Sequence, residues 1–156
     1  MAFIDVNKLS TIDKVVVGSG AVGLIALFLP WYGFSSPYAS ASVSGFSAGY
    51  GFLGALLIVA TGLYLGMLRS GASMPKTSVG PAVLTLGGSV IGAGLVLLRW
   101  LLAGRVSYSS ISYSYGPRFG MIIEVLAGVV QAVCALRLFR SSGEELPWKD
   151  THTSGA

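Results

Sequence analysis

Two charged side chains fall inside apolar stretches of the sequence and are the main candidates for chemistry. Arg99 lies near the end of the stretch 81–103, and Glu124 lies near the start of the stretch 119–139. If both stretches are membrane-spanning helices, a rise of about 1.5 Å per residue places both charges roughly 6–8 Å below the same membrane surface. Because an unpaired charge in a bilayer costs several kcal/mol, the spacing predicts an intramembrane ion pair between Arg99 and Glu124.

This predicted pair has two interpretations that the sequence leaves open. It could lock the third and fourth spans together, or it could form a ligand, ion or partner site at the outer mouth of a bundle. Gln131 lies two helical turns beyond Glu124, on roughly the same helix face. A glutamine at this depth usually makes an interhelical hydrogen bond of about 1 kcal/mol. A conduit from Glu124 to Gln131 is the alternative, although the first two spans offer no matching acid or base.

The composition indicates the elements that must position these residues. The 156-residue chain is 53% hydrophobic and only 10% charged, which excludes an ordinary water-soluble domain. Four apolar stretches are long enough to cross a bilayer, which takes roughly 20 helical residues. They cover about 15–34, 50–68, 81–103 and 119–139. The sequence therefore predicts an all-α membrane protein, with a four-helix bundle over 15–139 between a segment 1–14 and a tail 140–156.

Positively charged residues predict how the spans are oriented, because Lys and Arg concentrate in cytoplasmic loops. Seven fall in the N-terminal segment, the second loop and the tail: Lys8, Lys14, Arg69, Lys76, Arg137, Arg140 and Lys149. Three fall at the other side: Arg99, Arg105 and Arg118. We therefore expect a multi-pass plasma-membrane protein with both termini in the cytoplasm. The net charge of +4 then reflects membrane orientation rather than a nucleic-acid surface.

The two predicted outer loops are rich in serine and tyrosine. Serine alternates with Tyr, Ala, Val or Ile over 38–44 and 111–115, and this period of two favours short strands over helices. We expect the two loops to pair into a small extracytoplasmic β cap, the alternative being flexible Ser/Gly linkers. Tyr and Ser are also common in adaptable recognition surfaces. The aromatic residues predicted to serve outer-loop contacts are Trp31, Tyr32, Tyr38, Tyr108, Tyr113 and Tyr115.

Small residues recur at helix-packing spacing within the spans. The glycines at these positions are Gly62, Gly66, Gly88, Gly92 and Gly128. Small residues four apart let helix backbones approach closely in a membrane. The spacing alone does not distinguish packing within one protomer from packing between copies.

Several classes of site lack the residues that they need. One cysteine excludes a disulfide framework, and one histidine, in the tail, excludes a His-rich metal centre. The glycines lie inside apolar stretches, without the strand, Lys or acidic residue of a nucleotide-binding loop. We therefore expect no metal, no cofactor and no enzymatic activity.

The segment Phe28-Leu29-Pro30-Trp31-Tyr32 resembles the end of the first helix in small bacterial four-span proteins of unknown function. The layout is also similar to claudin-type tetraspan proteins, which have a Trp just after the first span and strand-forming outer loops. The cysteine pair and further tryptophans of the claudin loop are missing here, so a barrier-forming role does not carry over. Neither resemblance implies a catalytic residue.

These observations predict a non-enzymatic tetraspan protein that acts as an interaction, accessory or self-assembling subunit in a membrane protein complex. Its expected partners are the lipid bilayer and other membrane proteins or further copies of itself, not nucleic acid. The alternative is a small transporter or pore subunit that uses Arg99, Glu124 and Gln131.

Overall fold

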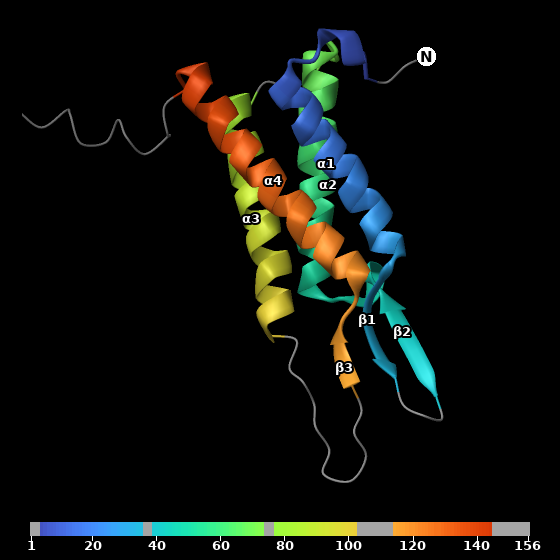
Figure 1. The fold of residues 1–156 in the computed structure, drawn as a ribbon. Coiled ribbons are helices and arrows are strands. Elements are labelled where there is room, and N and C mark those ends of the chain that lie inside the picture. The colour runs from blue at the N-terminus through green and yellow to red at the C-terminus, as the bar shows by residue number, and fades with distance from the viewer. Residues whose placement is uncertain (1–3, 36–38, 74–76, 103–113, 145–156) are drawn as a thin grey trace, which may run out of the picture.

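The computed structural model describes residues 4–35, 39–73, 77–102 and 114–144, which form four long helices and a small sheet (Figure 1). The helices are α1 (Thr11–Phe28), α2 (Tyr50–Arg69), α3 (Pro81–Leu102) and α4 (Phe119–Ser142). Each of them is long and apolar enough to cross a membrane. The predicted multi-pass helical architecture is therefore confirmed. Two short 3-10 helices, η1 (Val6–Lys8) and η2 (Gly45–Ser47), precede α1 and α2.

The four helices form a bundle in which α1 and α3 each pack against both α2 and α4. The helix α1 begins, and α4 ends, at the end of the bundle that lies away from the sheet (Figure 1). We call this the opposite end, and we call the end with the three strands the sheet end.

Local sequence signals fix both ends of α1. A capping box opens the helix: the Ser10 hydroxyl accepts from the Asp13 amide, and the Asp13 carboxylate accepts from the Ser10 amide. The helix ends at Phe28 because Pro30 disfavours a helical conformation at Leu29, whose φ and ψ are −81° and 159°. The first predicted span, 15–34, therefore extends too far, since residues 30–35 form a strand.

The sheet has three antiparallel strands in the order β2-β1-β3. They are β1 (Pro30–Ser35), β2 (Ser40–Ser44) and β3 (Ser114–Pro117). Gly33 at the centre of β1 is opposite Ser42 of β2 and Gly116 of β3. Both predicted loops contribute a strand to this one sheet, β2 and β3, but the two strands do not pair with each other, because β1 lies between them. Residues 36–38 and 103–113 lie outside the described residues.

Two buried clusters hold the bundle together. The cluster at the sheet end includes Leu27, Trp31, Ile58, Val96 and Met121 and so draws on all four helices and β1. The cluster nearer the opposite end is built from Val16, Leu65, Ala82 and Leu138. Many large apolar side chains instead face outward, as lipid-facing residues of a membrane bundle do.

Candidate functional site

Glu124 is completely buried in the bundle. Its side chain extends from α4 towards α1, where a Cβ atom at Gly23 would lie 3.1 Å from Glu124 Oε1. The absence of a side chain at Gly23 therefore makes room for the carboxyl group. Neither carboxyl oxygen has a hydrogen-bond partner. Such a group carries a desolvation cost that hydrogen bonds do not offset.

Arg99 does not pair with Glu124, so the predicted intramembrane ion pair is not formed. The guanidinium carbon of Arg99 lies 4.9 Å from the ring centre of Tyr32 and 5.6 Å from that of Tyr50. The Arg99 side chain passes the first turn of α2, since a Cβ at Gly51 would lie 2.8 Å from Arg99 Cγ. Counting residues along the two spans places both charges at a similar depth in the membrane. Depth alone, however, does not specify the direction in which a side chain points. The ring faces of two tyrosines stabilise the cation instead.

Gln131 makes the interhelical hydrogen bonds expected from the sequence. Its Nε2 donates to the Ile58 carbonyl of α2 at 3.0 Å and to the Ser89 hydroxyl of α3 at 3.2 Å. Gln131 is fully buried, and its Oε1 has no partner. One face of α4 thus presents three buried oxygens without donors, two from Glu124 and one from Gln131. Chemically, these oxygens are able to accept hydrogen bonds or coordinate a cation.

The five predicted packing glycines all contact other parts of the same chain. A Cβ at Gly62 would lie 3.0 Å from the Gly20 Cα atom, and one at Gly92 would lie 2.8 Å from the Gly54 carbonyl oxygen. Gly66 faces Ile4 and Val17, Gly88 faces Thr61, and Gly128 faces Ile58 and Ala93. Their close contacts therefore serve folding of the protomer.

Other glycines face outward. A Cβ at Gly18 of α1, or at Gly87 or Gly94 of α3, would meet nothing within 4 Å. Gly18 lines an outward-facing groove of about 400 Å³ between α1 and α4. The groove is lined by Val15, Gly18, Ser19, Val22, Ile123, Leu126, Ala127 and Val130. The Ser19 hydroxyl donates to the Val15 carbonyl at 2.8 Å, so the groove surface is almost entirely apolar.

The aromatic residues predicted for outer-loop contacts lie differently from expectation. Trp31 and Tyr32 are 0% and 2% exposed and belong to the core at the sheet end. The Trp31 indole donates to the Ala26 carbonyl at 2.8 Å, which fixes β1 against the end of α1. Both are therefore structural residues, because they lie at the start of β1 with their side chains buried in the core. Tyr38, Tyr108 and Tyr113 lie outside the described residues, and Tyr115 is described only by its backbone pairing with Phe34.

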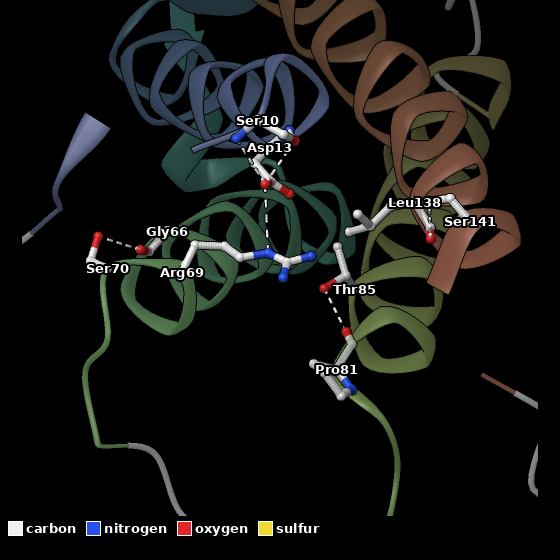
Figure 2. A network of polar contacts seen from close by, with 9 residues as sticks. All are labelled: Ser10, Asp13, Gly66, Arg69, Ser70, Pro81, Thr85, Leu138 and Ser141. Carbon is white, nitrogen blue, oxygen red and sulfur yellow. Dashed lines mark hydrogen bonds and ion pairs between the residues drawn. The ribbon is translucent and has the colours of Figure 1, made fainter. Parts of the chain in front are cut away.

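Polar contacts join the helices at the opposite end (Figure 2). Sequence spacing did not predict them. Arg69, in the last turn of α2, lies 3.5 Å from the Asp13 carboxylate in the first turn of α1. The Asp13 side chain is only 5% exposed, whereas that of Arg69 is 45% exposed. Glu144 Oε2 accepts from the Ala82 and Val83 amides at the start of α3. The sequence does contain a signal for the Asp13–Arg69 ion pair, because Asp13 lies in the first turn of α1 and Arg69 in the last turn of the neighbouring α2.

Within the described ranges, no cluster of three or more His, Cys, Asp or Glu residues is arranged to hold a metal ion. Cys134 is partly buried on α4 beside the cluster at the opposite end. Comparisons with family models, curated proteins and solved structures give no match to this chain. Neither the resemblance of the FLPW segment nor the claudin-like layout gains support from them.

Proposed function

We propose that this chain is a non-enzymatic tetraspan protein that acts as an accessory or self-assembling subunit of a membrane protein complex. In this proposal the protein lies in the plasma membrane with both termini in the cytoplasm and the three-stranded sheet outside. The excess of Lys and Arg at the opposite end supports this orientation. The sheet then forms an extracytoplasmic cap over the ends of the helices.

The groove between α1 and α4 is the observation that carries the proposal. It extends over residues 15–22 of α1 and 123–130 of α4, or about 10 Å along each helix. Among the residues that line the groove, Gly18 and Ala127 are small and leave it open. Val15, Val22 and Leu126 are larger and line it beside them. In a membrane, small residues that let backbones approach are the usual basis of helix association. Because Gly18 meets no other part of the chain, its missing side chain does not serve folding of the protomer.

The occupant that fits this groove is an apolar transmembrane helix from another subunit. The Ser19 hydroxyl is already bonded within α1, so the groove presents no free polar side chain that needs a charged or polar ligand. Its two helices are both membrane-spanning, so a partner must reach it from within the bilayer. A helix whose backbone lies against Gly18 meets these conditions.

A pair of glycine variants tests this proposal. Gly18→Leu fills the groove, and Gly94→Leu adds the same side chain to an equally open position on α3. The complex is sized after extraction of the full chain from its membrane in a gentle detergent. We expect the wild type and Gly94→Leu to remain in a complex larger than the monomer, and Gly18→Leu to be released as a monomer. Release of neither or of both variants, or a monomeric wild type, contradicts the role of the groove.

A second candidate function rests on Glu124. Its two unpartnered oxygens and Oε1 of Gln131 lie deep in a membrane-spanning bundle, where ionisable groups often mark ion or proton pathways. We therefore propose, as the alternative, a small transporter or pore subunit in which Glu124 and Gln131 contact the transported ion. Arg99, held by Tyr32 and Tyr50, would then act at the sheet end of the pathway.

Flux measurements separate the two functions. The full chain is reconstituted in liposomes that contain a pH-sensitive dye, and proton and sodium gradients are applied. The transporter function predicts a flux above that of protein-free liposomes, lost in Glu124→Gln and retained in Gly18→Leu. Equal flux from the wild type and Glu124→Gln removes this alternative.

A further inference from the structure

Arg118 is held firmly at the junction between the sheet and α4. Its backbone amide donates to the Trp31 carbonyl at 2.7 Å, and its Nη2 donates to the Ser35 hydroxyl at 2.8 Å. The side chain lies across Gly33 of β1, where a Cβ would be 2.6 Å from Arg118 Nε. The guanidinium therefore occupies one defined position on the face of the sheet, because Gly33 has no side chain to displace it.

Within the described part of the chain, no carboxylate pairs with the charge of Arg118. The sequence contains no Asp or Glu between Asp13 and Glu124, and Glu124 is buried inside the bundle. Among the described residues, the ion pairs are Lys8–Asp5 and Arg69–Asp13, both at the opposite end. Ser35 accepts one hydrogen bond, whereas a guanidinium has five N–H donors. Several donors of Arg118 are therefore available to an external acceptor.

Two cavities flank this guanidinium. One, of about 250 Å³, is lined by Gly33, Ser35, Gly116, Pro117 and Arg118. The other, of about 290 Å³, has Ser35 and Arg118 in common with the first and adds the serines Ser40 and Ser42 of β2. Arg118 thus lies between two spaces whose other polar side chains are hydroxyl groups. Hydroxyl donors around an arginine suit a tetrahedral oxyanion, since Arg binds phosphate oxygens in a bidentate manner.

We propose that Arg118, with Ser35, Ser40 and Ser42, binds the phosphate group of an anionic phospholipid. The site lies directly before the first turn of a membrane-spanning helix, which is the level of lipid headgroups. Phe119, the next residue, also lines the larger cavity and is 53% exposed, so it offers an apolar contact for the lipid beside the phosphate site. This inference does not depend on the groove between α1 and α4.

Native mass spectrometry of the detergent-solubilised full chain tests the proposal, with phosphatidylglycerol and phosphatidylcholine as probes. We expect phosphatidylglycerol to bind more tightly than phosphatidylcholine, and Arg118→Gln to weaken phosphatidylglycerol binding by about tenfold. Arg118→Lys keeps the charge and should retain part of the affinity. Gly33→Ala keeps the charge but displaces the guanidinium, so it should also weaken binding.

Arg140→Gln is the matched control, because it removes one positive charge from an exposed position at the opposite end. An equal loss in Arg118→Gln and Arg140→Gln, or equal binding of the two lipids by the wild type, overturns the proposal. Inorganic phosphate is added as a competitor to separate the two sources of the ligand. Displacement of the lipid only at a large excess of phosphate supports a lipid site. A site that binds inorganic phosphate as tightly as phosphatidylglycerol overturns the lipid assignment.

Discussion

Gly20 of α1 and Gly62 of α2 bring the backbones of their two helices into contact. A Cβ at Gly20 would lie 3.1 Å from the Gly62 Cα atom, and a Cβ at Gly62 would lie 3.0 Å from the Gly20 Cα atom. Both are tighter than ordinary van der Waals contacts. The glycine motif of α2 is therefore used inside the protomer, whereas Gly18, Gly87 and Gly94 remain open on the outside of the bundle.

The first prediction compares two glycine-to-alanine variants. Gly62→Ala forces α1 and α2 apart and should lower the free energy of unfolding by about 1–3 kcal/mol. Gly18→Ala meets no atom within 4 Å and should be neutral or stabilise α1 by up to about 1 kcal/mol. Unfolding in mixed micelles with increasing SDS measures both. A similar loss in the two variants would mean that Gly20 and Gly62 are not in contact.

The second prediction concerns independence of Arg99 and Glu124. Because the two do not pair, Arg99→Met and Glu124→Gln should have additive effects on the free energy of unfolding, within about 0.5 kcal/mol. A double-mutant cycle with Tyr50→Leu should instead couple to Arg99 by about 0.5–1 kcal/mol, the value of a cation–π contact. Strong coupling between Arg99 and Glu124, with no coupling between Arg99 and Tyr50, would show that the ion pair exists after all.

The third prediction concerns the ion pair at the opposite end. Arg69→Met leaves the Asp13 carboxylate buried without its cation and should cost about 1–2 kcal/mol, a value reduced by the 45% exposure of Arg69. Lys8→Met is the matched control, since Lys8 and Asp5 are 60% and 43% exposed at a separation of 3.8 Å, and it should cost less than about 0.5 kcal/mol. SDS titration measures both, and equal costs argue against a structural role for Arg69.

The fourth prediction concerns the start of α3. Glu144→Ala removes the acceptor of the Ala82 and Val83 amides and should destabilise the helix start by about 1 kcal/mol. Those two amides should then exchange hydrogen for deuterium faster than they do in the wild type, whereas amides in the middle of α3 should keep their exchange rates. Glu144→Gln retains an acceptor and should show a smaller effect. Unchanged exchange in Glu144→Ala would show that Glu144 does not cap α3.

Hydropathy predicted α2, α3 and α4 to within a few residues, because their apolar stretches coincide with helices. Hydropathy did not predict the end of α1. Trp31, Tyr32 and Phe34 continue the apolar stretch although Pro30 has already ended the helix. An apolar strand and an apolar helix have the same hydropathy. The central strand β1 was not predicted for this reason: both loops contribute a strand to the sheet, but they pair with β1, whose residues were counted as part of a span.

For the polar residues, the sequence predicted the depth of each side chain in the bundle but not the direction in which it points. Their depth along a span follows from counting residues, and Gln131 accordingly bonds across the bundle. The direction of Arg99 depends on Gly51, Tyr32 and Tyr50, which come from other elements. Contacts of this kind require the packing of several helices, so sequence spacing alone did not reveal them.

Photo-crosslinking from two positions of α1 tests the central proposal most directly. A diazirine residue replaces Val22, which lines the groove, or Ile25, which is 62% exposed on the same helix but does not line the groove. Irradiation of intact membranes should join Val22 to one protein of discrete mass and Ile25 to lipid alone. Lipid adducts alone from both positions would contradict the proposal that the groove holds a helix of another subunit.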